Sequence, residues 1–341
     1  MQPNGGPPPA HAVEAPAPNG PATSPALAIV VDTEEEFDWN APFDRNATGV
    51  GHMRQIDRLQ SLCEAWGLRP TYVVDYPIAT QAPGIEALAP LLRDGRALIG
   101  AHLHPWVSPP HEEAVNGHNS FPGNLPPALE RAKLGILRDA IAAAFGEVPR
   151  IYKAGRYGIG PNSFAILEEL GFEIDLSPAP PFDYRAAGGP DFSRRGLAPE
   201  WVGPARRVLS IPGTGALIGR APSPGLYALA TRGPAMALRL PGILARLGLV
   251  ERLGLSPEGH SAEDMLRLVR WLIGRGQRLF VLSLHSPSVA PGHTPYVRSA
   301  ADLEAFLATL EAFLRTFMTE LGGVPTDPLA VHAAWSATRP A

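Results

Sequence analysis

The sequence is poor in cysteine, in long apolar runs and in concentrated basic segments. Cys63 is the single cysteine of the 341 residues, which excludes both an internal disulfide and a zinc cluster built from cysteines. The longest wholly apolar run near the start covers residues 26–31, whereas a membrane-spanning helix needs ~20 apolar residues. The formal net charge is −4 and no long run of Lys or Arg is present. We therefore do not expect a nucleic-acid-binding protein.

Residues 1–25 differ in composition from the rest of the chain. They contain eight prolines, three glycines and one charged residue, Glu14, and so offer too little apolar surface to offset the entropy cost of ordering. We interpret them as a disordered leader. They lack the basic segment and the following apolar stretch of a secretory signal peptide, so we expect a cytoplasmic protein.

From residue 26 onward, short β-prone runs alternate with segments of helical spacing. Predicted strands cover residues 27–31, 71–74, 97–104, 151–154, 173–176 and 278–284. Predicted helices cover residues 53–66, 85–94, 129–145, 162–170, 262–273 and 302–321. Repeated βα units indicate a parallel sheet, either open and doubly wound or closed into a barrel. No glycine-rich phosphate loop follows the first strand, which disfavours a nucleotide-binding fold.

Polar residues follow the predicted strands, where α/β proteins place their active sites. Asp32 and Glu34 are two residues apart after the first strand, and His102 and His104 have the same spacing after the third. In extended backbone, residues two apart point to the same face. Two imidazoles and one or two carboxylates form a ligand set for zinc or a related divalent metal.

Other polar strand-end residues allow a plainer reading. We interpret Glu35 and Glu36 as part of a solvated loop. His285 follows the late strand, where it could serve catalysis or be a hydrogen-bonded core histidine.

The ordered landmarks resemble the polysaccharide deacetylase family of carbohydrate esterases. They are the acidic cluster after the first strand, the histidine pair, a basic motif around Lys153 and Arg156, a mid-chain Asp175 and the late Leu-x-Leu-His that ends at His285. The resemblance covers residues 26–335. It implies one domain, a distorted (β/α) barrel of about seven parallel strands with inserted segments at about 109–127 and 216–255.

The resemblance also implies a metal site. Glu34 stands at the position of the family's acidic ligand, and His102 matches the first metal histidine. The family usually places its second histidine four residues after the first, where this chain has Trp106, so His104 takes that role here. The expected metal is Zn²⁺, with Co²⁺, Ni²⁺ and Mn²⁺ as alternatives.

Catalytic roles are carried over in the same way. Asp32 resembles the general base, and Lys153 or Arg156 supplies the cation that keeps it ionised. His285 resembles the catalytic acid, and Asp175 resembles the carboxylate that orients it.

Candidate substrate-binding residues are the aromatic and amide side chains beside these motifs: Trp39, Trp106, Asn119 and Tyr157. The segment 109–127, which contains Asn119, suits either a sugar-binding loop or a plain connection. The segment 216–255 carries Arg232, Arg239 and Arg246 at intervals of seven and is almost free of acids. It is either a helical segment packed on the barrel or a peripheral contact to an anionic membrane or lipid-linked glycan.

The resemblance, together with the candidate metal ligands, implies a metal-dependent hydrolase that removes an acetyl group from a sugar, polysaccharide or glycolipid. Two alternatives stay open. One is an inactive family member that binds glycan or a partner in polysaccharide assembly. The other is a different metal-assisted carbohydrate hydrolase on the same fold.

Overall fold

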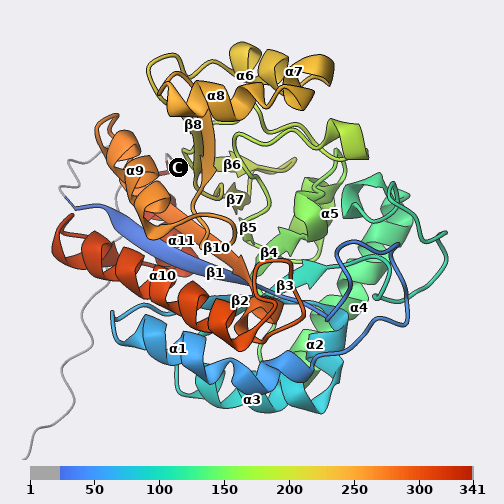
Figure 1. Ribbon diagram of the computed structural model, residues 1–341. Coiled ribbons are helices and arrows are strands. Elements are labelled where there is room, and N and C mark those ends of the chain that lie inside the picture. Colours follow the sequence, from blue (N-terminus) through green and yellow to red (C-terminus); the bar gives the residue numbers. More distant parts are fainter. Residues whose placement is uncertain (1–23, 340–341) are drawn as a thin grey trace, which may run out of the picture.

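The structure, a computed structural model, describes residues 24–339. A curled sheet of parallel strands forms its centre (Figure 1). Seven strands pair in parallel in the order β10-β1-β2-β3-β4-β5-β7. Their bounds are Leu279–His285 (β10), Ala26–Thr33 (β1), Thr71–Val74 (β2), Leu98–Leu103 (β3), Ile151–Ala154 (β4), Ile174–Asp175 (β5) and Val208–Ser210 (β7). The predicted leader lies outside the described residues, apart from Ser24 and Pro25.

Shorter strands complete the β-structure. Strand β6 (Glu200–Val202) pairs antiparallel with β7, and β11 (Val324–Pro325) pairs with β1. Strands β8 (Gly215–Ile218) and β9 (Glu251–Gly254) form a separate antiparallel pair.

The gap between β10 and β7, the first and last parallel strands, is bridged by hydrogen bonds from β10 to Thr214 and Leu255, and the Thr214 amide also donates to the Val281 carbonyl at 3.1 Å. The amide of Val281 on β10 donates to the Thr214 hydroxyl at 2.8 Å, and the amide of Ser283 donates to the Leu255 carbonyl at 3.1 Å. Thr214, which directly precedes β8, and Leu255, which directly follows β9, therefore bind backbone groups on an edge of β10 that no strand covers.

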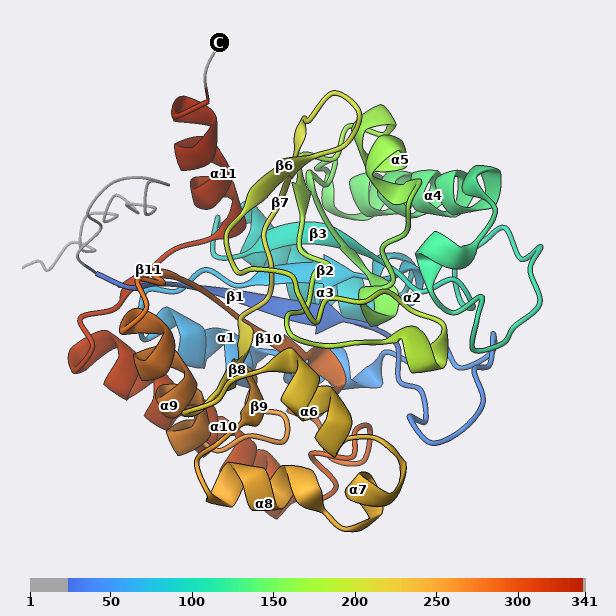
Figure 2. The ribbon, with the colours of Figure 1, turned by 90° about the horizontal axis from the view of Figure 1, so that it is seen from above.

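Helices surround the sheet (Figures 1 and 2). They are α1 (Asp57–Glu64), α2 (Tyr76–Thr80), α3 (Ala82–Arg93), α4 (Pro127–Phe145), α5 (Ser163–Glu169), α6 (Pro224–Ala230), α7 (Gly233–Ala237), α8 (Leu240–Arg246), α9 (Ala262–Ile273), α10 (Ala300–Thr319) and α11 (Pro328–Ala337). Short 3₁₀ turns occupy Gly51–Gln55 (η1), Pro122–Asn124 (η2), Gly155–Tyr157 (η3), Arg185–Ala187 (η4) and Ser286–Val289 (η5). Over residues 24–339, none of the helices combines the length and the apolar character that crossing a bilayer requires.

Strand alternation divides the apolar residues into two cores. On β1, Leu27, Ile29 and Val31 belong to the large core shared with the helices, whereas Ala28 and Val30 belong to a small core inside the curled sheet. The same division holds on β10. On β1, β3, β4 and β10 the inward positions are thus apolar at the start of the strand and polar at its carboxyl end, which places a layer of polar side chains above the small apolar core.

The predicted fold is confirmed: the structure is a distorted (β/α) barrel with a parallel-dominated sheet. Predicted strands at 71–74 and 151–154 have the observed bounds, and the predicted helix at 53–66 is η1 followed by α1. The sequence patterns missed α2, α11, the strands β6 to β9 and the short β11. Segment 216–255 is the β8–β9 pair with α6, α7 and α8 between its strands.

A buried lysine fixes the chain that leaves β3. Lys133 on α4 donates to the carbonyls of Pro105, at 3.0 Å, and Ser108, and it forms an ion pair with Glu113 at 3.0 Å. The side chains of Lys133 and Glu113 are 0% and 4% exposed. These contacts hold the segment that directly follows His104.

Replacing this lysine tests how far the segment depends on it. Lys133→Met should lower the free energy of unfolding by about 3–5 kcal/mol, because it removes the nearest cation from a buried carboxylate, which keeps only Arg45 at 3.7 Å, and removes the donor to two carbonyls. Chemical denaturation measures this. Arg131→Met, on the same helix but with an exposed ion pair to Glu169, is the matched control and should change stability little. Equal effects of the two substitutions would contradict the anchoring role of Lys133.

Candidate active site

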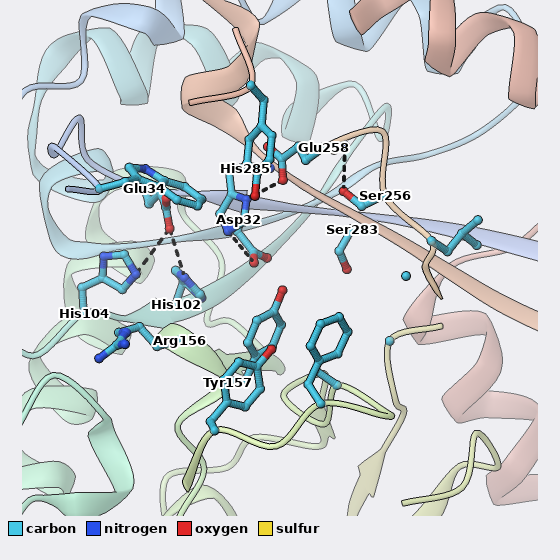
Figure 3. A pocket seen from close by; sticks show the side chains of 18 of the residues that line it. Asp32, Glu34, His102, His104, Arg156, Tyr157, Ser256, Glu258, Ser283 and His285 are labelled. Atoms are coloured by element: carbon cyan, nitrogen blue, oxygen red, sulfur yellow. Dashed lines mark hydrogen bonds and ion pairs between the residues drawn. The ribbon is translucent and has the colours of Figure 1, made fainter. Parts of the chain in front are cut away.

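The carboxyl ends of β1, β3 and β10, together with the η3 turn that follows β4, line one cavity of about 530 Å³ (Figure 3). Strand register places Asp32 beside His285 and His102 beside Lys153. Alternation turns all four inward, because each lies an even number of residues beyond an inward apolar position. The sequence-predicted residues of four different segments therefore meet in one place.

Asp32 and Lys153 form a buried ion pair across the interior of the sheet. The Lys153 ammonium donates to both carboxylate oxygens of Asp32, at 2.6 and 2.7 Å. Burial alone would raise the pKa of Asp32, but the Lys153 charge, helped by His102 and His285, outweighs it and lowers that pKa. Asp32 is thus ionised at neutral pH and can act as a proton acceptor.

Glu34, His102 and His104 converge at the other side of the cavity. Glu34 Oε2 lies 3.5 Å from His102 Nε2 and 3.4 Å from His104 Nε2, and the three ligand atoms of this group lie within 4.8 Å of one another. All three side chains are buried. A side chain at Gly155 would collide with the His104 ring and the Leu103 carbonyl, so only glycine fits at that position.

The outer nitrogens of both imidazoles are held by protein oxygens. His102 Nδ1 lies 2.9 Å from the Lys153 carbonyl, and His104 Nδ1 lies 2.7 Å from Glu35 Oε2. A carbonyl only accepts, so His102 carries a proton on Nδ1, and in the neutral imidazole the lone pair of Nε2 faces Glu34. This carboxylate–histidine or carbonyl–histidine arrangement is the usual support of metal-ligating histidines.

Glu35 is not the solvated loop residue that the sequence suggested. It is fully buried, and its backbone amide donates to Asp75 Oδ2 at 2.6 Å. Burial raises the pKa of Glu35 to about 8, and burial together with the neighbouring Glu35 raises that of Asp75. Glu36 is also engaged, since it binds His52 through the amide at 2.6 Å and through Nδ1 at 3.1 Å.

Glu34, His102 and His104, here called the Glu34 group, offer donor atoms that suit a divalent metal. Glu34 Oε1 is buried and has no hydrogen-bond partner within residues 24–339. Burial lowers the pKa of His104, which keeps its imidazole neutral, as ligation requires. A carboxylate and two imidazole nitrogens with a water in the fourth position match catalytic zinc sites.

The carboxylate that orients His285 is Glu258, which sequence reasoning missed. Glu258 Oε2 lies 2.7 Å from His285 Nδ1, and its other oxygen accepts from the His285 amide at 3.1 Å. Burial would lower the pKa of His285, but the charges of Glu258, Glu34 and Asp32 raise it to about 10. His285 Nε2 faces Asp32 Oδ2 at 3.7 Å, so its proton points into the cavity.

The expected contact between Asp175 and His285 is absent. Asp175 accepts from the Ser177 amide at 3.0 Å and from the Ser210 hydroxyl at 2.8 Å, and it does not line the cavity. The reason is the alternation of side chains along β5. Ile174 and Leu176 point into the inner core, so Asp175 between them points to the opposite, outer face of the sheet.

Lys153, not Arg156, is the cation on Asp32. Arg156 lines the cavity but packs on the rings of Phe121 and Phe43, with its guanidinium carbon 4.1 and 5.1 Å from the ring centroids. Burial lowers the pKa of this guanidinium. Because the ordinary pKa of arginine is far above neutral, Arg156 still places a cation in the wall near His104 (Figure 3).

Aromatic rings form two walls of the cavity. Trp39 meets the His285 ring edge-on at 4.9 Å, and Tyr157 stacks on Tyr184 at 5.4 Å. Trp39 and Tyr157 thus lie where substrate-binding residues were expected. Trp106 instead is buried and stacks on His104 at 4.2 Å. Asn119 binds the Ala114 carbonyl within its own loop and does not line the cavity.

Removing the carboxylate beside His285 tests the assignment of Glu258. Glu258→Gln should lower the pKa of His285 from about 10 toward the usual 6.5, as measured by NMR titration of the imidazole. In the unaltered protein, the stability that His285 contributes is complete below pH 6.5 and is lost as the pH rises toward 10. Asp175→Asn is the control and should leave the His285 titration unchanged. A shift in the control with none in Glu258→Gln would restore the role first expected of Asp175.

Comparisons with known proteins identify the fold. No family model and no curated protein sequence matches the chain. Among solved structures, a polysaccharide deacetylase of Pseudomonas aeruginosa PAO1 is 15% identical with a TM-score of 0.57 over 96% of each chain. One of Mycobacterium smegmatis is 17% identical with a TM-score of 0.51 over 97% of this chain and 100% of the other.

An allantoinase, Puue, has a similar structure as well. It is 16% identical with a TM-score of 0.57 over 96% of this chain and 95% of that one. At these sequence identities, the similarity indicates the fold only, and the reaction has to be inferred from the residues of the site. With its half-barrel of parallel strands and these structural neighbours, the chain has the polysaccharide deacetylase fold.

Proposed function

We propose that this protein is a metal-dependent hydrolase that removes an acetyl group from a sugar, polysaccharide or glycolipid. One observation carries the proposal. A three-ligand group, a carboxylate held ionised by lysine and a histidine held protonated by glutamate all face one cavity. Such a combination supplies the parts that hydrolysis of an amide or ester needs.

Glu34, His102 and His104 would hold the metal. A divalent ion there supplies a Lewis acid for the acyl carbonyl and lowers the pKa of a nucleophilic water. Zn²⁺ suits the nitrogen and oxygen ligands best, and Co²⁺, Ni²⁺ and Mn²⁺ are the alternatives.

Asp32 and His285 would divide the proton transfers between them. Asp32 accepts the proton of the nucleophilic water, and Lys153 keeps Asp32 ionised before each turnover. His285 donates the proton on Nε2 to the leaving nitrogen or oxygen of the sugar. Glu258 stabilises the imidazolium through Nδ1, and the edge contact with Trp39 holds the ring in place.

The walls of the cavity support a ring-shaped, polar substrate. Trp39 and the stacked Tyr157 and Tyr184 offer flat apolar surfaces, while Arg156 and Ser283 offer hydrogen-bond donors. Cavities of this kind combine apolar walls with a few placed polar groups. Allantoin, which the name of one structural neighbour indicates, is the rival substrate.

Metal content tests the ligand assignment. The purified chain should bind one divalent metal, and His102→Ala should lose it, because two ligands are too few for a stable site. His285→Ala should keep the metal, since His285 lies outside the ligand group. Elemental analysis after dialysis against Zn²⁺ measures both. Loss of the metal in His285→Ala would exchange the roles of acid and ligand, and a metal-free unaltered chain would favour the inactive glycan-binding alternative.

Acetate release tests the reaction. Asp32→Asn and His285→Ala should each lower turnover of acetylated sugar oligomers by roughly 10²–10⁴-fold, the usual contribution of a positioned base or acid. Circular dichroism checks that both variants fold, because Asp32→Asn leaves the Lys153 charge buried. Hydrolysis of allantoin without acetate release would reject the deacetylase in favour of the rival substrate. Unchanged acetate release in both variants would place catalysis elsewhere.

A further inference from the structure

The helices α6, α7 and α8 form an outlying layer between β8 and β9. Figures 1 and 2 place this layer at the periphery, with no other described element on its outer side. Its inner side has a core of its own: Leu217, Ala230, Leu244 and Val250 are buried there. Leu226, Tyr227, Leu240 and Leu249 pack against this core, so the layer has apolar packing of its own.

The layer exposes large aliphatic side chains to solvent. Within residues 24–339, the exposed large apolar residues number eight, and five of them lie in this short segment. Those five, which we call the aliphatic patch, are Leu229 (65% exposed), Met236 (57%), Leu238 (73%), Ile243 (46%) and Leu247 (57%). Apolar residues gathered on a surface in this way mark a site of interaction.

The charges of the segment all have one sign. Between Glu200 and Glu251 the sequence has no Asp or Glu, and the exposed cations of the layer are Arg220, Arg232, Arg239 and Arg246. Within the described part of the chain, none of the four lies within 4.0 Å of a carboxylate oxygen. Their charge is therefore available to an anionic partner.

We propose that α6–α8 docks on a bilayer that contains anionic lipids. The aliphatic patch would enter the boundary between head groups and acyl chains, and the arginines would contact the phosphates. The chemistry favours lipid over other anionic partners. The patch has no exposed aromatic ring of the kind that stacks on single-stranded nucleic acid, and no exposed acid of the kind that alternates with Arg in the polar rim of a protein interface.

The docking layer is connected to the cavity by one stacked arginine. The Arg252 guanidinium, on β9, lies 5.2 Å from the Tyr227 ring of α6 and 4.4 Å from the Phe182 ring, which lines the cavity. If the proposed function holds, the substrate class is an acetylated sugar attached to the same bilayer. The docking itself does not depend on that function.

Co-sedimentation of the full chain with vesicles tests the proposal. The chain should sediment with vesicles of equal parts phosphatidylcholine and phosphatidylglycerol and stay in solution with phosphatidylcholine alone. High salt should weaken the binding, because exposed charges are screened. Leu238→Glu and the double variant Arg232→Glu/Arg246→Glu should each weaken it by about tenfold or more. The altered side chains are exposed, so circular dichroism and thermal melting should remain as in the unaltered chain.

Matched controls separate the layer from general surface effects. Val148→Glu removes an aliphatic side chain that is 56% exposed elsewhere, and Arg93→Glu reverses an exposed charge on α3. Both controls should bind vesicles like the unaltered chain, and so should Asp32→Asn, which separates docking from catalysis. The proposal is overturned if the chain ignores both vesicle types, or if the variants bind as well as the controls. A dimer that Leu238→Glu dissociates would also overturn it, because a second copy would then cover the patch.

Discussion

The ion pair between Lys153 and Asp32 is the contact on which the arrangement of the site depends. Both charges are buried inside the sheet, where removing one partner would leave the other without compensation. Lys153 acts through two groups. Its ammonium holds Asp32 ionised, and its backbone carbonyl fixes the proton of His102 on Nδ1. One residue of β4 thereby sets the protonation of the base on β1 and turns a histidine nitrogen of β3 toward Glu34.

The remaining charges explain why the Glu34 group calls for a cation. Asp32 is neutralised by Lys153, and Glu258 is neutralised by the protonated His285. Glu34 is buried and faces two imidazole nitrogens, one of which turns a lone pair toward it. A buried carboxylate beside a lone pair is unfavourable unless a proton or a cation lies between them. A divalent metal would supply that cation, and the Asp32–Lys153 and Glu258–His285 pairs would keep their charges.

The metal-site residues that could be predicted from the sequence share one property: they are polar residues spaced two apart at the carboxyl end of a strand. Glu34, His102 and His104 could be inferred in this way because parallel strands bring their carboxyl ends to one edge. Asp175 also ends a strand, but it lies between the apolar Ile174 and Leu176, which point into the inner core, so Asp175 points to the outer face. This alternation of apolar and polar residues is visible in the sequence. Glu258 could not be found, because it lies in a loop after an antiparallel strand whose pairing depends on contacts distant in sequence. The buried state of Glu35 depends likewise on Asp75, forty residues away.

The segment between β7 and α9 links the site to the surface of the protein. Thr214 and Leu255 satisfy the free edge of β10, and three residues later Glu258 binds the histidine with which that strand ends. The same segment carries α6–α8 between its two strands. Strand β9 therefore connects the outer layer directly to the chain that positions Glu258. A parallel strand in that place would have closed the sheet, but it would have brought neither the carboxylate to His285 nor an arginine-rich layer to the surface.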